Sequence, residues 1–93
     1  MKDQHGWDKF IQNCHQIESV EKLKQFFALT LTPAECEKIA ARYLILDELI
    51  AAKLTHREIA AKLKVSIFNV TRGANQLKIT PTETKQLLSL KDD

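Results

Sequence analysis

The stretch from Leu54 to Leu77, LTHREIAAKLKVSIFNVTRGANQL, predicts two short helices joined by a tight turn. Thr55 and Glu58 stand three residues apart, which is the spacing of a capping box at the start of a helix. Ser66 can cap the second helix in the same way. The apolar or small residues recur at helical spacing at Ile59, Ala60, Leu63, Ile67, Val70 and Leu77. The stretch therefore predicts a helix-turn-helix.

The turn of this motif has one unusual residue. A small side chain at Ala60 suits two helices that cross steeply, because their backbones must approach closely. The turn position that favours glycine, because it needs a positive φ, is Lys64, and a left-handed residue other than glycine costs about 1 kcal/mol. Three amphipathic helices of an ordinary bundle can give the same spacing by chance, so a structural bundle is an alternative.

The distribution of charge favours a nucleic-acid partner. Residues 53–79 contain six Lys or Arg and one acid, a net charge of +5, whereas residues 1–52 carry −2 and residues 80–93 carry −1. A protein of total charge +2 has thus concentrated its positive charge on one motif, as phosphate neutralisation requires. A solvated Lys-rich face explains Lys62 and Lys64, but it does not explain why acids are scarce only here.

Length and composition predict one all-α domain. The chain has 93 residues, 44% of them hydrophobic, with only two Gly and two Pro, and no strand-like alternation is sustained. So short a chain buries a modest share of its surface, and this hydrophobic content suggests burial against a second subunit. Cys14 and Cys36 have no metal-binding spacing and are expected to be small buried hydrophobes. No apolar run is long enough for a membrane, and we expect a cytoplasmic protein.

Six helices are expected in residues 1–93, taken as a single domain. Residues 7–30 would form two N-terminal dimerisation helices, and 33–52 a central helix that is apolar around most of its circumference and therefore buried. The helix-turn-helix would occupy 55–79, and a short last helix 81–90.

Start signals support this division. Residues 7–20 carry one apolar stripe of helical spacing, which predicts a single first helix. Thr32 and Glu35 flank Pro33 as a capping box for the central helix. The same device recurs at Thr80 and Glu83 and predicts a capped last helix.

Three features together resemble the bacterial tryptophan repressor family, over roughly residues 29–90. They are LTPAE at Leu31–Glu35, Arg42 in the central helix, and VTRGANQLK at Val70–Lys78. The resemblance implies a six-helix subunit in an intertwined homodimer that binds operator double-stranded DNA. It also implies L-tryptophan as corepressor and repression of tryptophan biosynthesis genes.

The resemblance implies a set of residues for L-tryptophan, which are Leu29, Leu31, Thr32, Arg42, Leu46, Arg72, Gly73 and Gln76. The two arginines would sandwich the indole, with Arg72 also holding the carboxylate, as a guanidinium can. Gly73 would leave space for the ring. The carbonyls of Leu29 and Leu31, beside Thr32, would face the ammonium. Gln76 departs from the small hydroxyl of the family, which puts the hydrogen bond to the amino group in doubt.

It also implies a set of DNA-contacting residues, which are His56, Arg57, Lys64, Ser66, Ile67, Phe68, Asn69, Thr71 and Lys78. Arg57 matches an arginine that reaches a guanine edge, where bidentate contact is favourable. Phe68 and Asn69 replace small residues, so an altered operator is expected. His56 can equally be an ordinary surface residue of a first helical turn.

Other classes of protein remain alternatives. An enzyme is not expected, because Cys14-His15 and Asp47-Glu48 are sequence neighbours whose side chains diverge on a helix. No metal site is expected. A ligand-independent helix-turn-helix module would share the motif, and a structural helical dimer without DNA binding would share the composition. Arg42 taken alone would be an ordinary surface cation, and the pairing of Arg72 with a mid-helix Gly73 is what favours a ligand.

Overall fold

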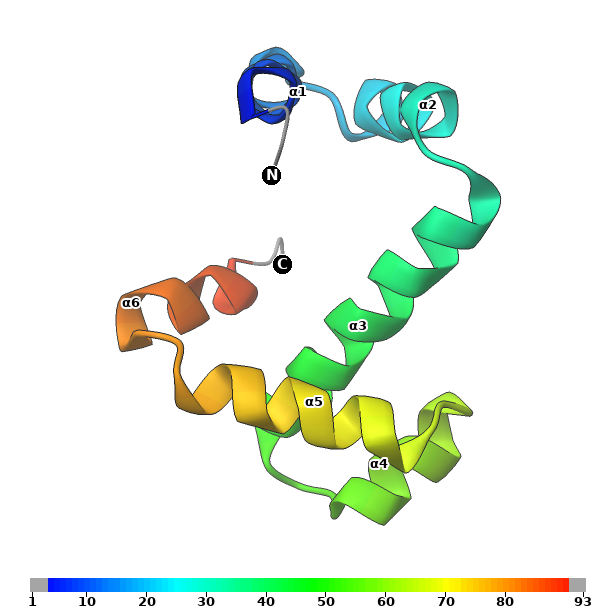
Figure 1. Cartoon of the computed structure of the whole chain (residues 1–93), viewed down its shortest axis with the longest axis vertical. Helices are drawn as coiled ribbons and strands as arrows, with labels where there is room; N and C mark the ends of the chain where they lie inside the picture. Colours follow the sequence, from blue (N-terminus) through cyan, green and yellow to red (C-terminus); the bar gives the residue numbers. More distant parts are fainter. Residues whose placement is uncertain (1–3, 91–93) are drawn as a thin grey trace. The chain divides into compact units, whose positions relative to one another are not determined.

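Every regular element is helical among residues 4–90, the part of the chain that the computed structural model describes (Figure 1). The helices in chain order are α1 (Gln4–Gln16), α2 (Val20–Thr30), α3 (Pro33–Ala51), α4 (His56–Leu63), α5 (Ile67–Lys78), α6 (Thr82–Lys85) and the 3-10 helix η1 (Gln86–Ser89). The prediction of an all-α chain with six helices is confirmed for these residues.

The chain divides into two compact units, Met1–Cys36 and Glu37–Asp93. The boundary falls inside α3, so the first turn of this helix belongs to the first unit and its remaining turns to the second. The grouping of residues 1–93 into one domain stays a prediction.

Aromatic rings hold the first unit together. The ring of Phe10 on α1 stacks on Trp7, with centroids 5.6 Å apart, and on Phe26 of α2, at 5.5 Å. Phe27 lies at 6.1 Å from Phe10. These separations are within the range in which aromatic pairs stabilise a core. The apolar side of α1 therefore packs against the aromatic residues of α2.

The boundary between the first two helices lies earlier than expected. The hydroxyl of Ser19 accepts a hydrogen bond from the backbone N–H of Lys22 at 3.2 Å and caps α2. The single helix predicted for residues 7–20 is therefore wrong at its end, because α1 stops at Gln16 and Val20 already belongs to α2. Cys14 and Cys36 are free and half-buried, so the prediction that they are buried is wrong.

The predicted capping box at the start of α3 is confirmed. The backbone N–H of Thr32 donates to Glu35 Oε1 at 2.8 Å, and the backbone N–H of Glu35 donates to the Thr32 hydroxyl at 3.1 Å. Two N–H groups that lack helical partners are satisfied by this exchange.

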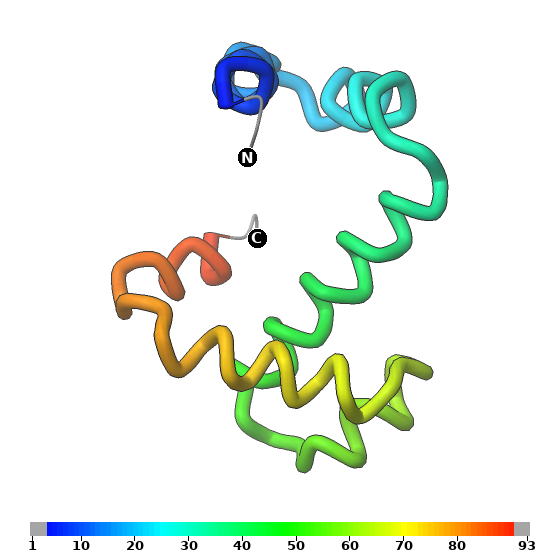
Figure 2. The backbone as a smooth tube through the Cα atoms, in the orientation of Figure 1, coloured from blue at the N-terminus to red at the C-terminus, as the bar shows by residue number. Residues whose placement is uncertain are grey.

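The core of the second unit forms where α3, α4 and α5 meet. Ile45 of α3, Ile59 of α4 and Val70 of α5 are buried, at 3%, 0% and 0% exposure. Burying such a side chain stabilises a fold by about 1.5–3 kcal/mol. The partly buried apolar residues around them are Leu49, Leu54, Ala60, Leu63 and Val65. In the view of Figures 1 and 2, α5 crosses the C-terminal end of α3, and α4 lies below this crossing.

The local geometry of residues 55–78 agrees with the predicted motif. Thr55 and Glu58 form the complete capping box of α4, and the hydroxyl of Ser66 caps α5 by accepting from the backbone N–H of Asn69 at 3.1 Å. Lys64 ends α4 with φ 57° and ψ 44°, in the left-handed region. Two capped helices joined by a left-handed residue therefore make this segment, as its residues predict.

The central helix is less covered than its sequence suggests. Only Ile45 of α3 is buried, whereas Ile39, Tyr43, Leu44 and Ile50 are exposed. The prediction of a buried helix is therefore wrong for the single chain, because α4 and α5 cover only one side of it. The rest of its apolar surface is left open within the described chain.

The last helix begins without the predicted cap. Pro81 is the N-cap of α6 and makes no side-chain cap bond. The hydroxyl of Thr80 instead donates to the carbonyl of Gln76 at 2.6 Å, on the preceding helix. The predicted box at Thr80 and Glu83 is therefore wrong, because the end of α5 competes for that hydroxyl.

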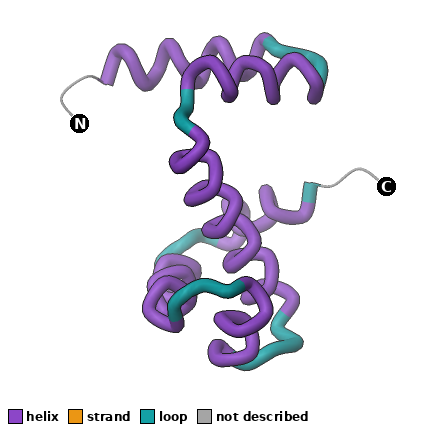
Figure 3. The backbone as a smooth tube through the Cα atoms, turned by 90° about the vertical axis from the view of Figure 1, so that its right-hand side faces the viewer, coloured by secondary structure: helices purple, strands orange, loops and turns teal. Residues whose placement is uncertain are grey.

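The connections between the helices are short, as the teal segments of Figure 3 show.

Candidate functional site

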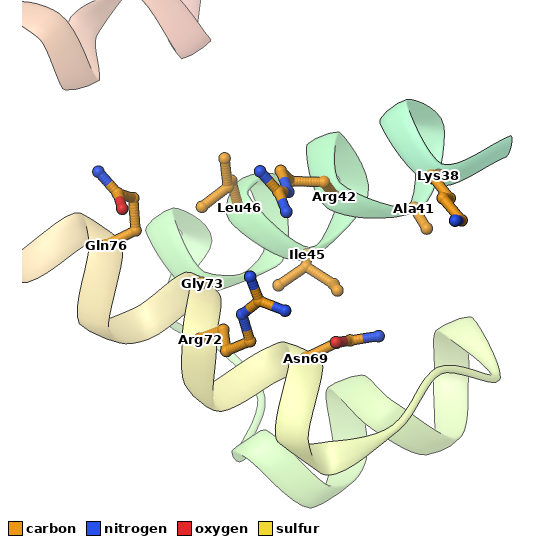
Figure 4. A pocket seen from close by; sticks show the side chains of 9 residues that line it. All are labelled: Lys38, Ala41, Arg42, Ile45, Leu46, Asn69, Arg72, Gly73 and Gln76. Carbon is orange, nitrogen blue, oxygen red and sulfur yellow. The ribbon is translucent and has the colours of Figure 1, made fainter. Parts of the chain in front are cut away.

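One pocket of about 480 Å³ lies between α3 and α5 in the second unit. The residues that line it are Lys38, Ala41, Arg42, Ile45 and Leu46 from α3, and Asn69, Arg72, Gly73 and Gln76 from α5. Their spacing of three and four residues on each helix places them on the two facing sides. Figure 4 shows Arg72 reaching from α5 toward α3 and Ile45 reaching from α3 toward α5.

Most of the residues expected to bind L-tryptophan line this pocket. They are Arg42, Leu46, Arg72, Gly73 and Gln76. The structure thus brings together five positions that are up to 34 residues apart in sequence. Their role toward a ligand stays a prediction.

The other three expected ligand residues belong to the first unit. Leu29 is 83% exposed at the end of α2. The backbone N–H of Leu31 donates a hydrogen bond to the carbonyl of Phe27. The hydroxyl of Thr32 accepts a hydrogen bond from the backbone N–H of Glu35 in the capping box of α3. These residues are thus placed by local helix ends, and their contribution to a ligand site also stays a prediction.

The pocket is cationic. Lys38, Arg42 and Arg72 carry the only formal charges among its nine lining residues, and none of the nine is acidic. Like charges held close to one another repel, and an anionic group placed among them is stabilised. Two guanidiniums add planar, paired donors that suit a carboxylate. The arrangement can therefore bind a small carboxylate with an aromatic or aliphatic body.

Gly73 is explained by packing inside the chain. A Cβ added to it would meet the side chain of Ile45 at 2.9 Å and that of Leu49 at 3.3 Å. The glycine therefore allows α5 to approach α3 closely. Its presence therefore does not by itself require a ligand, because close packing against Ile45 and Leu49 accounts for it.

Four residues of this lining were not predicted to be ligand residues from the sequence. They are Lys38, Ala41 and Ile45, together with Asn69, which was predicted to contact DNA. The signal was present, since Lys38 and Ala41 precede Arg42 and Ile45 by one helical turn each. The crossing of α3 and α5, which decides that these turns face a pocket, could not be read from either helix alone.

The residues expected to contact DNA are all exposed, at positions 56, 57, 64, 66, 67, 68, 69, 71 and 78. His56 and Arg57 begin α4, and Lys64 and Ser66 form the turn. Phe68 is 67% exposed. These side chains are accessible to a partner, and their DNA contacts stay predictions.

Not all of the positive charge in this region is unpaired. Lys62 of α4 forms an ion pair with Glu48 of α3, with Nζ and Oε2 2.5 Å apart. The lysine side chain is more than half exposed, so the pair contributes at most about 1 kcal/mol. The pair links α4 to α3.

Glu58, the acid within residues 53–79, stabilises the start of α4. Hydrogen bonding lowers the pKa of the Glu58 carboxyl, chiefly through the backbone N–H of Thr55 and to a lesser extent through the Thr55 side chain. The ionised form of Glu58 thus caps α4, where a negative charge is favourable at a helix N-terminus.

Within residues 4–90, no cluster of three or more His, Cys, Asp or Glu side chains could hold a metal ion. No helix of the described residues is both long and apolar enough to cross a membrane.

The profile of the Trp repressor protein family matches residues 5–92 of the chain. The chain belongs to the Trp repressor family. It is 44% identical over 86 residues to a Trp operon repressor homolog of Chlamydia caviae, covering 92% of this chain and 85% of that protein. It is 37% identical to the homolog of Chlamydia trachomatis serovar L2, covering 94% and 93% of the two chains. It is 31% identical to the homolog of Vibrio parahaemolyticus, covering 90% and 82%.

The match to the Trp repressor family covers more of the chain than the sequence motifs predicted. The motifs indicate a resemblance over roughly residues 29–90, whereas the family profile begins at residue 5 and so includes α1 and α2. The aromatic unit built by these two helices is therefore part of the Trp repressor fold in this chain.

Proposed function

We propose that the chain is a tryptophan-dependent repressor that binds operator DNA as a homodimer. Membership in the Trp repressor family, whose relatives here are named Trp operon repressor homologs, supports a regulatory role rather than an enzymatic one. The observation that carries the proposal is the pairing of Arg42 and Arg72, from two helices, across one acid-free pocket.

The chemistry of this pocket suits L-tryptophan. Its two guanidiniums can stack on the faces of an indole, and Arg72 can hold the carboxylate through paired donors. Leu46 and Ile45 supply apolar lining. Gln76 stands at the wall where the family offers a small hydroxyl, and its amide can serve the ligand's amino group.

A second subunit would complete the site. The pocket has no acid to attract the ammonium of tryptophan. Helix-terminal carbonyls can accept from an ammonium, and those of Leu29 and Leu31, at the end of α2, are proposed to do so from the other subunit. The open apolar surface of α3, including Leu44 at 45% exposure, supports such a homodimer because water-exposed residues of this kind favour burial against a partner.

The proposed mechanism uses the position of the pocket beneath α5. Tryptophan bound between α3 and α5 sets the angle of α5, so that two copies enter successive major grooves about 34 Å apart. The ligand shifts the population of the motif toward this state by its differential affinity for it. Exposed cations such as Arg57 and Lys78 contact bases or phosphates, and the bound dimer represses tryptophan biosynthesis genes.

A selection of DNA tests this function against the two alternatives. Double-stranded DNA is selected from a random pool by the purified protein, with and without L-tryptophan, and the enriched sequences are tested by mobility shift. Enrichment and shift that require tryptophan support the proposal. Equal enrichment in both arms supports a ligand-independent helix-turn-helix module, and none in either arm supports a structural helical dimer. Arg72→Leu is the control, and it should enrich no DNA in a tryptophan-dependent way.

A further inference from the structure

The guanidinium of Arg72 lies over the ring of Phe68, with its carbon 5.8 Å from the ring centroid. The two residues are four apart on α5, so they are neighbours on the helix surface. Arg72 lines the pocket in this same conformation, whereas Phe68 does not line it and is 67% exposed. The contact therefore joins a pocket residue to an exposed ring outside the pocket.

The charges around Arg72 explain why this contact matters. Lys38 and Arg42 line the same pocket without any acid among the lining residues, so each cation raises the cost of holding the next. A long arginine side chain also loses rotamer entropy when it is held in one place. The electron-rich face of an aromatic ring attracts a cation without neutralising it. Phe68 thus offsets repulsion while leaving the guanidinium charge available to a ligand.

We propose that Phe68 is a positioning residue that holds Arg72 at the wall of the pocket, ready for the carboxylate of L-tryptophan. This inference rests on the proposed function, because it assigns Phe68 to the same ligand site. Phe68 was expected from the sequence only to contact DNA. In this proposal Phe68 also positions Arg72 at the pocket, so one exposed residue belongs to both the predicted DNA-contacting surface and the corepressor site.

Calorimetric titration with L-tryptophan in the absence of DNA tests the inference. Phe68→Leu removes the aromatic face and keeps apolar bulk, whereas Phe68→Tyr keeps the face and is the matched control. An exposed cation–π contact corresponds to a loss of about two- to fivefold in tryptophan affinity for Phe68→Leu. Phe68→Tyr should bind as the wild type does. The thermal unfolding midpoints of all three proteins should agree, since the ring is exposed.

A double-mutant cycle with Arg72→Lys separates positioning from other effects. A lysine ammonium cannot present paired donors, so Arg72→Lys lowers affinity by itself. Phe68→Leu should then cost less in the Arg72→Lys background than in the wild type, because the group that it positions is gone. Nitrogen-15 NMR of the Arg72 side chain gives a second measurement. Its Nε–H resonance should show a ring-current shift in the wild type and in Phe68→Tyr, and lose it in Phe68→Leu.

The outcomes distinguish this inference from the function on which it rests. Equal affinity of wild type and Phe68→Leu, with a functional wild-type site, overturns the positioning role and leaves the proposed function standing. Equal losses in the two backgrounds of the cycle also overturn it. Absence of tryptophan binding by the wild type overturns the proposed function, and this inference with it.

Discussion

A Cβ atom added to Gly73 would lie 2.9 Å from Cγ2 of Ile45, closer than folded proteins allow. Ile45 is buried at 3% exposure, and its β-branched side chain is stiff about χ1, so it cannot easily move aside. The glycine thus fixes how closely α5 approaches α3. Because Ile45 and Gly73 both line the pocket, this approach also sets the pocket's width.

Gly73→Ala is therefore expected to destabilise the protein. Alanine is favoured over glycine in a helix interior by about 1 kcal/mol, but overpacking a core costs about 1–3 kcal/mol. We expect a net loss of about 1 kcal/mol, measured by denaturant unfolding.

Ile45→Leu supplies the control, because leucine keeps the volume of isoleucine and lacks the Cγ2 methyl group. The double variant should lose less stability than the sum of the two single losses. A gain of about 1 kcal/mol in Gly73→Ala, as at an unhindered helix position, would contradict the packing explanation.

Lys64→Gly should stabilise the turn of the motif. Lys64 has φ 57°, where a side chain costs about 1 kcal/mol that glycine avoids. We expect a gain of 0.5 to about 1 kcal/mol in the free energy of unfolding. Lys64→Ala removes the same charge but keeps a Cβ, so it should give no such gain. An equal gain in both variants would mean that charge and not backbone conformation sets the cost.

The stability gained in Lys64→Gly should also reduce the ligand dependence of the motif, because the motif then needs less ordering by the ligand. Hydrogen exchange of residues 55–75 should be slowed by L-tryptophan in the wild type, and less so in Lys64→Gly. Equal protection of the wild type with and without ligand would remove the idea that a mobile motif is ordered by the corepressor.

The capping box of α4 should make this helix sensitive to acid. The pKa of Glu58 is lowered from its ordinary value, chiefly by the backbone N–H of Thr55. A carboxyl of lowered pKa contributes stability that is present above its ordinary value and is lost as the pH falls through the lowered value. The amide hydrogens at the start of α4 should therefore lose protection against exchange as the pH falls below about 4.

Carbon-13 NMR titration of Glu58 checks the cause. Thr55→Val removes the hydroxyl and keeps the backbone N–H, so the pKa should rise only part of the way toward its ordinary value. A Glu58 pKa at or above the ordinary value in the wild type would refute the assigned role of the box.

The features predicted well from sequence are those that depend on neighbouring residues. Thr55 and Glu58, like Thr32 and Glu35, stand three residues apart and need only one helical turn to meet, and both pairs form the box that their spacing predicts. Lys64 takes the left-handed conformation that its place between two capped helices demands. Arg42 and Arg72 reach one pocket as the family resemblance implied.

The features predicted poorly depend on which elements meet in space. Thr80 has the spacing of a cap, but its hydroxyl is taken by the carbonyl of Gln76. The apolar circumference of α3 indicates burial, yet most of it is exposed because α4 and α5 cover only one side of the helix. Lys38 and Asn69 became pocket residues only through the crossing of α3 and α5.

The central claim is that L-tryptophan, held by Arg72, controls the affinity for DNA. The most direct measurement is the dissociation constant of a selected operator duplex with no ligand and with saturating L-tryptophan, for the wild type and for Arg72→Leu. The account predicts that tryptophan tightens DNA binding by the wild type at least about fivefold, the lower end of typical coupling between two sites. It predicts a ratio near one for Arg72→Leu. Equal affinity of the wild type in both conditions, or an undiminished ratio in Arg72→Leu, would contradict it.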